Sequence, residues 1–204
     1  MARLGLGDSW TCLFANDFDP NKVAAYERHF GAGHARCEDI AKLSAADLPG
    51  RASLAWASFP CQDLSLAGAR GGLDAPRSGA FFSFWRLMEA LRAEKRPPRI
   101  IALENVAGLL TSRGGADFAA VVERLTGAGY QTGALMIDAA EFVPQSRPRL
   151  FIVGYLGEAP QTFVAAAPDP QRTPPAMLRA VDLLSPTARR NFVWWRLPQP
   201  ALRN

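Results

Sequence analysis

Three short segments of the chain carry side chains that could act together as a nucleophile, an acid and an anion clamp. Cys61 lies in Phe59-Pro60-Cys61-Gln62, directly after a strand-like apolar run. Glu104 follows a second such run, and Arg147 and Arg149 precede a third. A thiol is a useful nucleophile near neutral pH because a few per cent of it is already thiolate. The set therefore indicates covalent chemistry that also needs a carboxyl group and a cation.

Each of these side chains also has a plainer interpretation when it is considered alone. Cys61 could be a buried free cysteine, Glu104 a surface acid, and the two arginines an exposed basic strand edge. Against this, a glutamate that closes a buried strand is unusual, and Cys61 sits where a side chain can face a cleft. Arg147 and Arg149 are two residues apart, so on an extended strand both would point to one face and clamp a phosphate or carbonyl oxygen.

Two acidic positions near the N-terminus suit a nucleoside cofactor. Asp17 ends an apolar run and is followed by Phe18. An acid at a strand end can accept both ribose hydroxyls, and an adjacent aromatic ring can stack on the base. Asp39, followed by Ile40, could contact an adenine amino group in the same way. Alone, Asp17 would equally fit a turn and Asp39 has little specificity.

The elements expected to position these side chains alternate between strands and helices. The expected strands are residues 11–15, 54–58, 100–103, 135–137 and 150–155, and the expected helices are 20–30, 79–94 and 118–125. This order predicts an α/β fold with a mainly parallel sheet, and the last two strands form a hairpin-like antiparallel pair. Ligands bind at the carboxyl ends of such strands, so we expect Asp17, Cys61 and Glu104 to converge on one cleft.

Composition narrows the class of protein. The chain has 204 residues, 49% hydrophobic and 21% charged, which suits one soluble domain. No apolar run approaches a transmembrane helix and the N-terminus is a poor signal peptide, so we expect an intracellular protein without membrane contact. Three cysteines without Cys-x-x-Cys spacing predict free thiols and no zinc site. A net charge of +4 is compatible with a polyanionic partner.

Five motifs in order resemble those of the cytosine-5 DNA methyltransferases. The three segments around Cys61, Glu104 and Arg147 look like that family's nucleophile, acid and arginine motifs. Asn16-Asp17-Phe18-Asp19 and Glu38-Asp39-Ile40 look like its two cofactor-contacting segments. Each motif is weak alone, but five in this order are highly specific. The resemblance spans roughly residues 1 to 155.

The resemblance implies a Rossmann-like fold with helices on both faces of the sheet, S-adenosylmethionine as methyl donor, no metal, and double-stranded DNA as partner. It implies catalytic roles for Cys61, Glu104, Arg147 and Arg149, a cofactor pocket lined by Asp17, Phe18, Asp39, Ile40 and Pro60, and DNA contacts by Gln62 and Ser65. Cytosine is expected to leave the duplex and enter the cleft, where Cys61 attacks ring carbon 6. Such a protein would be cytoplasmic, and nucleoid-associated in a bacterium or phage host.

The chain departs from the family pattern at both ends. The family begins with a strand that ends in Phe-x-Gly-x-Gly, whereas residues 1–10 resemble only part of the helix that follows it. We therefore expect residues 1–155 to be a partial catalytic domain without its first strand. Residues 156–204, rich in proline and arginine, lead toward a target-recognition domain for which they are too short.

Several functional hypotheses follow. The chain is a methyltransferase, an inactive fragment or a DNA-binding or regulatory remnant of one, or one part of a split enzyme with a complementing polypeptide. An unrelated cysteine hydrolase is disfavoured because His29 and His34 lie in a helix and its exit, far from the strand ends that carry the other candidate groups.

Overall fold

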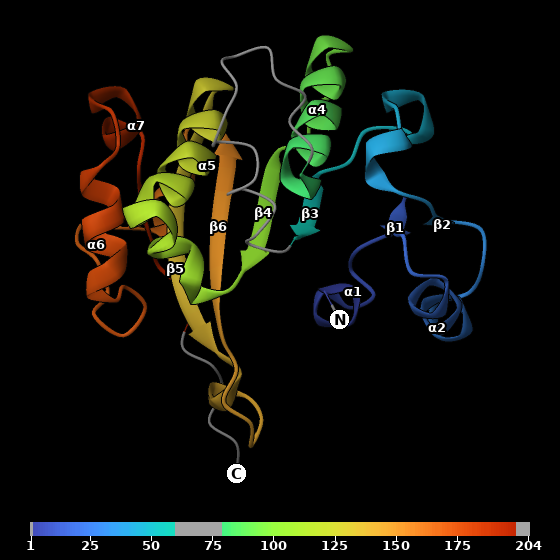
Figure 1. Cartoon of the computed structure of the whole chain (residues 1–204), viewed down its shortest axis with the longest axis horizontal. Coiled ribbons are helices and arrows are strands. Elements are labelled where there is room, and N and C mark those ends of the chain that lie inside the picture. Colours follow the sequence, from blue (N-terminus) through green and yellow to red (C-terminus); the bar gives the residue numbers. More distant parts are fainter. Residues whose placement is uncertain (1, 60–78, 199–204) are drawn as a thin grey trace.

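The computed structural model describes residues 2–59 and 79–198 as helices packed on β-sheet (Figure 1). The strands are β1 (Ala15–Asp17), β2 (Ala35–Cys37), β3 (Leu54–Ser58), β4 (Ile100–Asn105), β5 (Tyr130–Asp138), β6 (Pro148–Leu156), β7 (Val164–Ala165) and β8 (Trp194–Trp195). The α-helices are α1 (Ala2–Leu6), α2 (Pro20–Phe30), α4 (Ala80–Ala93), α5 (Ala116–Gly127), α6 (Pro175–Asp182) and α7 (Pro186–Arg190). Pro60, Cys61, Gln62 and Ser65 lie outside the described residues.

Four strands form the main sheet, in the order β3-β4-β6-β5. β3 pairs with β4 in parallel, whereas β6 is antiparallel to both of its neighbours. The expected hairpin-like pair is thereby confirmed. The sheet is not mainly parallel as expected, because one of its three strand pairings is parallel and two are antiparallel. Two parallel strands need a long crossover connection, and β5 and β6 are joined by a short turn with the 3-10 helix η6 (Ala139–Glu141), which permits only antiparallel pairing.

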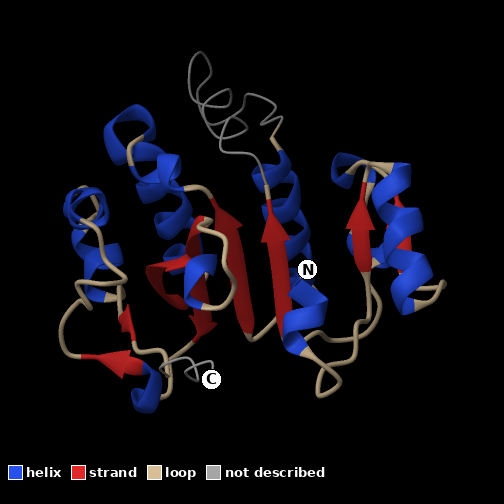
Figure 2. Cartoon of the chain, turned by 90° about the horizontal axis from the view of Figure 1, so that it is seen from below, coloured by secondary structure: helices blue, strands red, loops and turns tan. Residues whose placement is uncertain are grey.

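β1 and β2 form a separate two-stranded parallel sheet. Both views show this pair standing apart from the main sheet, at the right of each picture (Figure 2). Among the described residues no ladder joins β1 to β3. The expectation that Asp17 ends a strand neighbouring those of Cys61 and Glu104 is therefore wrong, because Asp17 belongs to the separate pair. The strand expected at residues 11–15 also begins later, since β1 can extend only as far as its short partner.

Side chains from α4 hold the connection between β2 and β3. Arg96, just beyond α4, donates to the backbone oxygens of Leu48, Gly50 and Ala45 at 2.6, 2.8 and 2.7 Å. Arg86 donates to two more backbone oxygens in the same connection, at 3.1 and 2.7 Å. The connection contains η1 (Ile40–Lys42) and η2 (Ala45–Asp47). Two arginines in or just beyond α4 thus hold the β2–β3 connection in place by hydrogen bonds.

The core lies between the main sheet and the helices α4 and α5. Strand side chains on one face, including Ile101, Leu103 and Ile152, are fully buried in one cluster with both helices. The apolar residues of α4 and α5 recur at helical spacing, so one side of each helix can face the sheet. The sequence-predicted helices and β3 match the observed ones to within about two residues, as such boundaries usually do.

The opposite face of the sheet is less covered. Trp56 on β3 remains 40% exposed, and its ring meets the ring of Phe151 edge-on at 5.9 Å. On β5, Gly133 lies under the chain at Val193 and Trp195. This face therefore combines an open apolar part over β3 with a covered part over β5.

The chain beyond β6 forms elements that the sequence pattern did not predict. α6 and α7 lie beside α5 (Figure 1), and Met177, Ala180 and Ala188 are buried there. Ser185 caps α7 and also donates to Glu123 on α5 through its backbone nitrogen and its hydroxyl. Each helix is short and begins with proline, so its apolar periodicity is too brief to stand out in the sequence. In the part of the chain that the structure describes, no helix is long and apolar enough to cross a membrane.

Candidate functional site

Glu104 and Arg149 form an ion pair at the carboxyl end of β4. Arg149 Nε lies 2.8 Å from Glu104 Oε1, and the two side chains are 20% and 22% exposed. Register explains the contact: Glu104 is paired with Phe151, so Arg149 is its diagonal neighbour on the same sheet face. From the sequence, Glu104 was interpreted as an acid and Arg149 as part of a separate clamp for an anion. In the fold the two residues contact each other, and the anion that Arg149 binds is the Glu104 carboxylate.

Asn105 fixes where the chain leaves β3. Its Nδ2 donates to the Phe59 backbone oxygen at 2.9 Å, and its Oδ1 accepts from the Val106 nitrogen at 2.8 Å. Asn105 is almost fully buried, so both bonds are shielded from water. These two contacts orient the backbone at Phe59 and Val106. Phe59, the residue before Pro60, is consequently held at the end of β4.

Ser58 is a site neighbour that sequence reasoning missed. It is the register partner of Glu104, and its hydroxyl accepts a hydrogen bond from Trp56 Nε1 at 3.2 Å. Ser58 and Glu104 therefore extend to the same face of adjacent parallel strands. No sequence signal marked Ser58, because serine at a strand end is common and only the register reveals its partner.

Arg147 lies just outside β6, which begins at Pro148. Arg147 is exposed and precedes β6 by one residue, so it lies outside the strand on which both arginines were expected, and their sharing of one face stays a prediction. Its backbone nitrogen donates to Asp138 Oδ1 at 2.6 Å. Among the described residues, no ion pair holds its guanidinium. The two arginines therefore occupy different settings, one paired with an acid and one open.

The described candidate cofactor residues lie at or just beyond the ends of β1 and β2. Asp17 is paired in register with Cys37, so the carboxyl ends of both strands meet. Asp17 Oδ1 accepts from the Asp19 nitrogen at 3.0 Å, and Oδ2 lies 3.7 Å from Lys22 Nζ. Phe18 is 77% exposed, and Lys22 Nζ lies over its ring at 5.9 Å from the ring centre, so most of the ring is accessible to a stacking partner. An acid with one weakly paired oxygen next to an open ring fits the nucleoside part of a cofactor.

Asp39 and Ile40 lie two and three residues beyond the end of β2. Asp39 Oδ1 accepts from the Ala41 nitrogen at 2.9 Å and so begins η1, while Ile40 packs against the core. The preceding Glu38 has its pKa lowered, chiefly because the Asp39 backbone nitrogen donates to it, and also by Lys42. The segment is thus anionic and fixed in shape, as a site for an amino group or hydroxyls requires.

Neither histidine of the chain belongs to the Glu104 site. His34 Nε2 lies 2.5 Å from Arg3 Nη1 and 3.0 Å from the Tyr26 hydroxyl. His29 contacts the ring of Phe30. Both lie in the β1–β2 unit, so the hydrolase alternative gains no catalytic pair from the described structure.

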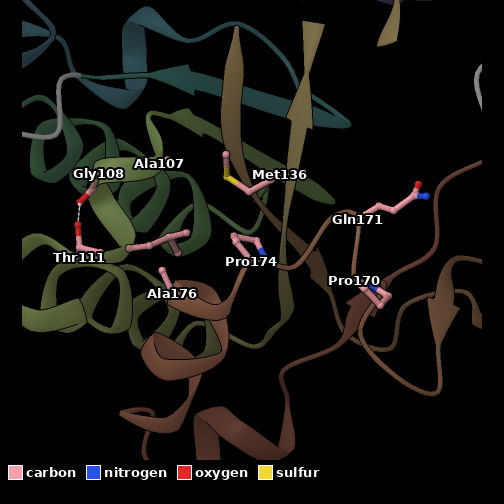
Figure 3. Close-up of a pocket in the computed structure, with 9 residues that line it drawn as sticks. Ala107, Gly108, Thr111, Met136, Pro170, Gln171, Pro174 and Ala176 are labelled. Carbon is pink, nitrogen blue, oxygen red and sulfur yellow. Dashed lines mark hydrogen bonds between the residues drawn. The ribbon is translucent and has the colours of Figure 1, made fainter. Parts of the chain in front are cut away.

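A pocket of about 440 Å³ lies elsewhere, between η4 (Ala107–Leu110), β5 and the start of α6 (Figure 3). Its lining includes Leu110, Met136 and Pro174 and is largely apolar. Met136 pairs with Leu150, so its side chain lies on the face opposite Glu104 and Arg149. The pocket is therefore not the site of the ion pair.

The sequence model of the family "C-5 cytosine-specific DNA methylase" matches residues 2–189. The chain is 35% identical over 173 residues to the Type II methyltransferase M.BsuFI of Bacillus subtilis, covering 82% of this chain and 40% of that protein. It is 32% identical over 148 residues to M.MspI of Moraxella sp, covering 72% of this chain and 34% of that protein.

Two solved methyltransferase structures resemble this chain in fold. The crystal structure of S. pombe Dnmt2 methyltransferase superposes with a TM-score of 0.58 at 26% identity, covering 74% of this chain and 45% of that one. A mutant of Spodoptera frugiperda DNMT2 gives 0.55 at 18% identity, covering 77% and 45%, which speaks for the fold alone.

The fold is thus that of a Rossmann-like methyltransferase, with an acid–arginine pair at the end of its central strands. The chain belongs to the C-5 cytosine-specific DNA methylase family. It spans less than half the length of the relatives named here.

Proposed function

We propose that this chain carries the base-binding part of a DNA (cytosine-5-)-methyltransferase. The observation that carries the proposal is the Glu104–Arg149 pair at 2.8 Å, set on the same face as Ser58 at the carboxyl ends of β3 and β4. The relatives' names describe Type II methyltransferases, and the motif order of this chain agrees with that chemistry.

The reaction begins with a cytosine turned out of the duplex. The Cys61 thiolate adds to carbon 6, and the ring's negative charge moves toward nitrogen 3 and carbon 5. A protonated Glu104 carboxyl group donates to nitrogen 3 and accepts from the exocyclic amino group, so this charge is not stranded. Carbon 5 would then take the methyl group from the sulfonium sulfur of the donor as that carbon–sulfur bond breaks, which leaves a neutral thioether. A base takes the proton from carbon 5, and the carbon 6–sulfur bond breaks to release Cys61 as a thiolate.

The arginines have different parts in this scheme. Arg149 contacts the cytosine carbonyl and keeps the Glu104 carboxyl group in one orientation through its Nε–Oε1 bond. Arg147, on the turn, helps to hold the segment that carries Cys61. Gln62 and Ser65 belong to that segment and contact DNA, Ser65 through a phosphate. Double-stranded DNA is the proposed partner.

S-adenosylmethionine would supply the methyl group. Asp17, Phe18, Asp39, Ile40 and Pro60 line its proposed pocket. The described members suit the nucleoside end, because Phe18 offers an open ring and the two aspartates offer oxygens at adjoining strand ends. No metal takes part in the proposal.

A second candidate is a part that needs a complementing polypeptide, or an inactive remnant that only binds DNA. The separation of β1–β2 from the main sheet favours this candidate, because in the described chain no strand joins the cofactor end to the base end. The proposed pocket would then be complete only when another segment supplies the connection.

Calorimetry with S-adenosylmethionine separates the two candidates. Heat of binding that is lost in Asp17→Ala supports an enzyme complete in this chain. Absence of heat at millimolar cofactor contradicts self-sufficiency and supports the second candidate.

The nucleophile is tested by mass spectrometry on DNA bearing 5-fluorocytosine. The expected covalent adduct, formed with S-adenosylmethionine present, disappears in Cys61→Ser. An adduct that persists in Cys61→Ser would show that another residue attacks the ring.

A further inference from the structure

The turn between β5 and β6 is organised around one carboxylate. Asp138, the last residue of β5, accepts three hydrogen bonds: Oδ1 from the nitrogens of Ala140 at 3.0 Å and Arg147 at 2.6 Å, and Oδ2 from the Ser146 hydroxyl at 2.7 Å. These donors come from both ends of the turn. A single side chain therefore joins the exit of β5 to the entry of β6.

The same turn is braced from outside. Glu141 accepts a hydrogen bond from the Asp138 nitrogen at 3.3 Å, which closes a capping box over η6. Both Glu141 carboxylate oxygens are also bound by Arg172, whose side chain is only 13% exposed. Arg172 is itself anchored, because its backbone oxygen accepts from the Met136 nitrogen at 2.8 Å on the edge of β5. The turn is thus held by contacts of Asp138, Glu141 and Arg172.

Arg147 lies in this turn, next to the first residue of β6. Its guanidinium is exposed and has no ion-pair partner among the described residues, while its backbone is tied to Asp138. A long cationic side chain placed on a rigid backbone loses less freedom when it binds an anion than one on a mobile loop. The fixed turn also sets the start of β6 at Pro148, one residue before Arg149.

We propose that Asp138 is a positioning residue, which orders the turn so that Arg147 is presented to bound DNA. This inference rests on the proposed function, which takes DNA as the partner of the chain, and it assigns Arg147 a contact with DNA in addition to its proposed part in holding the Cys61 segment. The inference predicts a change in DNA affinity opposite to the change that charge alone predicts when Asp138 is removed. Asp138 is an acid, and removing an acid from a DNA-binding surface should by charge alone strengthen binding. A positioning role predicts weaker binding.

The experiment measures affinity by fluorescence anisotropy, at fixed salt, for a labelled duplex that contains one mismatched cytosine. Asp138→Ala is expected to weaken binding on the order of fivefold, in line with the loss of about one hydrogen-bond-scale interaction. Asp138→Asn keeps an oxygen that can accept from the Ala140 and Arg147 nitrogens, so it should lose less. Arg147→Ala should weaken binding at least as much as Asp138→Ala.

The double variant Asp138→Ala/Arg147→Ala supplies the decisive comparison. If Asp138 acts through Arg147, the double variant binds no more weakly than Arg147→Ala. Additive losses would overturn the inference, because an unrelated structural defect adds to the loss of Arg147.

Asp47→Ala is the matched control. Asp47 is another acid in a capping box, on η2, and it accepts from the Ser44 nitrogen and hydroxyl. Its removal changes the net charge equally and should leave affinity unchanged or slightly higher. Binding by Asp138→Ala as tight as by Asp47→Ala would overturn the inference. A wild-type chain that binds no DNA would instead overturn the proposed function and the inference with it, and thermal melts of all variants identify any that fail to fold.

Discussion

At the scale of single residues, Glu104 and Arg149 depend on each other because each is about four-fifths shielded from water. Removing one partner leaves the other charge partly buried without compensation. We expect Arg149→Ala to destabilise the fold by about 1–2 kcal/mol, less than a fully buried pair would lose. Urea unfolding measures this loss. Adding Glu104→Gln to Arg149→Ala should recover part of it, and no recovery would show that the pair's charge is not the cause.

Asp138 makes the stability of the turn between β5 and β6 depend on pH. Hydrogen bonds from the Ala140 nitrogen, then Ser146 and the Arg147 nitrogen, lower the pKa of its carboxyl group. A lowered folded-state pKa means that the carboxylate stabilises the turn above the unfolded value, near 3.9, and that this contribution is lost as pH falls through the folded pKa. Amide exchange at Arg147, corrected for its intrinsic rate, should accelerate below about pH 4. Asp138→Asn should show no such acceleration.

Sequence alone identified the residue types of the site but not their relations. The Glu104–Arg149 contact follows from the β4–β6 register, which no local pattern encodes. Arg147 was placed on a strand because the two arginines alternate, yet β6 begins one residue later. The capping-box pattern of Asp138 and Glu141 was present in the sequence and could have indicated the turn's stability. The segment with Cys61 lies outside the described residues, so its role stays a prediction.

At the scale of elements, Gly133 controls how the C-terminal segment covers β5. A Cβ at this position would meet the Val193 backbone oxygen at 2.1 Å and Trp195 Nε1 at 2.6 Å. Gly133→Ala should therefore displace residues 193–195 and cost about 2–3 kcal/mol, as overpacking does. Tryptophan fluorescence during denaturation measures both effects.

Gly127 is the matched control, because a Cβ there meets nothing within 4 Å. Gly127→Ala, at the end of α5, should be neutral or stabilise by up to about 1 kcal/mol. Equal losses in the two variants would contradict the steric explanation. The elements themselves were well predicted where apolar periodicity was long, as in α2, α4 and α5. The brief helices α6 and α7 were missed because packing on α5, and not local pattern, makes them stable.

At the scale of the whole molecule, the β1–β2 unit and the main sheet are joined through side chains more than through backbone ladders. Arg96 makes three of these connections. Arg96→Ala should weaken the attachment of residues 45–50 by about 2–4 kcal/mol, the range for several charge-assisted hydrogen bonds. Hydrogen exchange should rise in residues 2–50 and change little in β4, β5 and β6.

Arg92, which is exposed at the end of the same helix, offers the control. Arg92→Ala should leave exchange in residues 2–50 unchanged. Uniform acceleration across the whole chain in Arg96→Ala would show that the two units open as one. The sequence predicted neither the two-sheet arrangement, since Asp17, Cys61 and Glu104 were expected on neighbouring strands, nor the attachment of the two sheets through Arg86 and Arg96.

The exposed outer edge of β3 has one more consequence, which concerns colloidal behaviour. Its residues, Leu54-Ala55-Trp56-Ala57-Ser58, contain no charge and no proline, and β4 is their one ladder partner among the described strands. Natural proteins guard such edges with lysine, proline or bulges, because an unguarded strand templates another. The isolated chain at high concentration should thus be prone to edge-to-edge association, and any polypeptide that occupies this edge would act as its solubiliser.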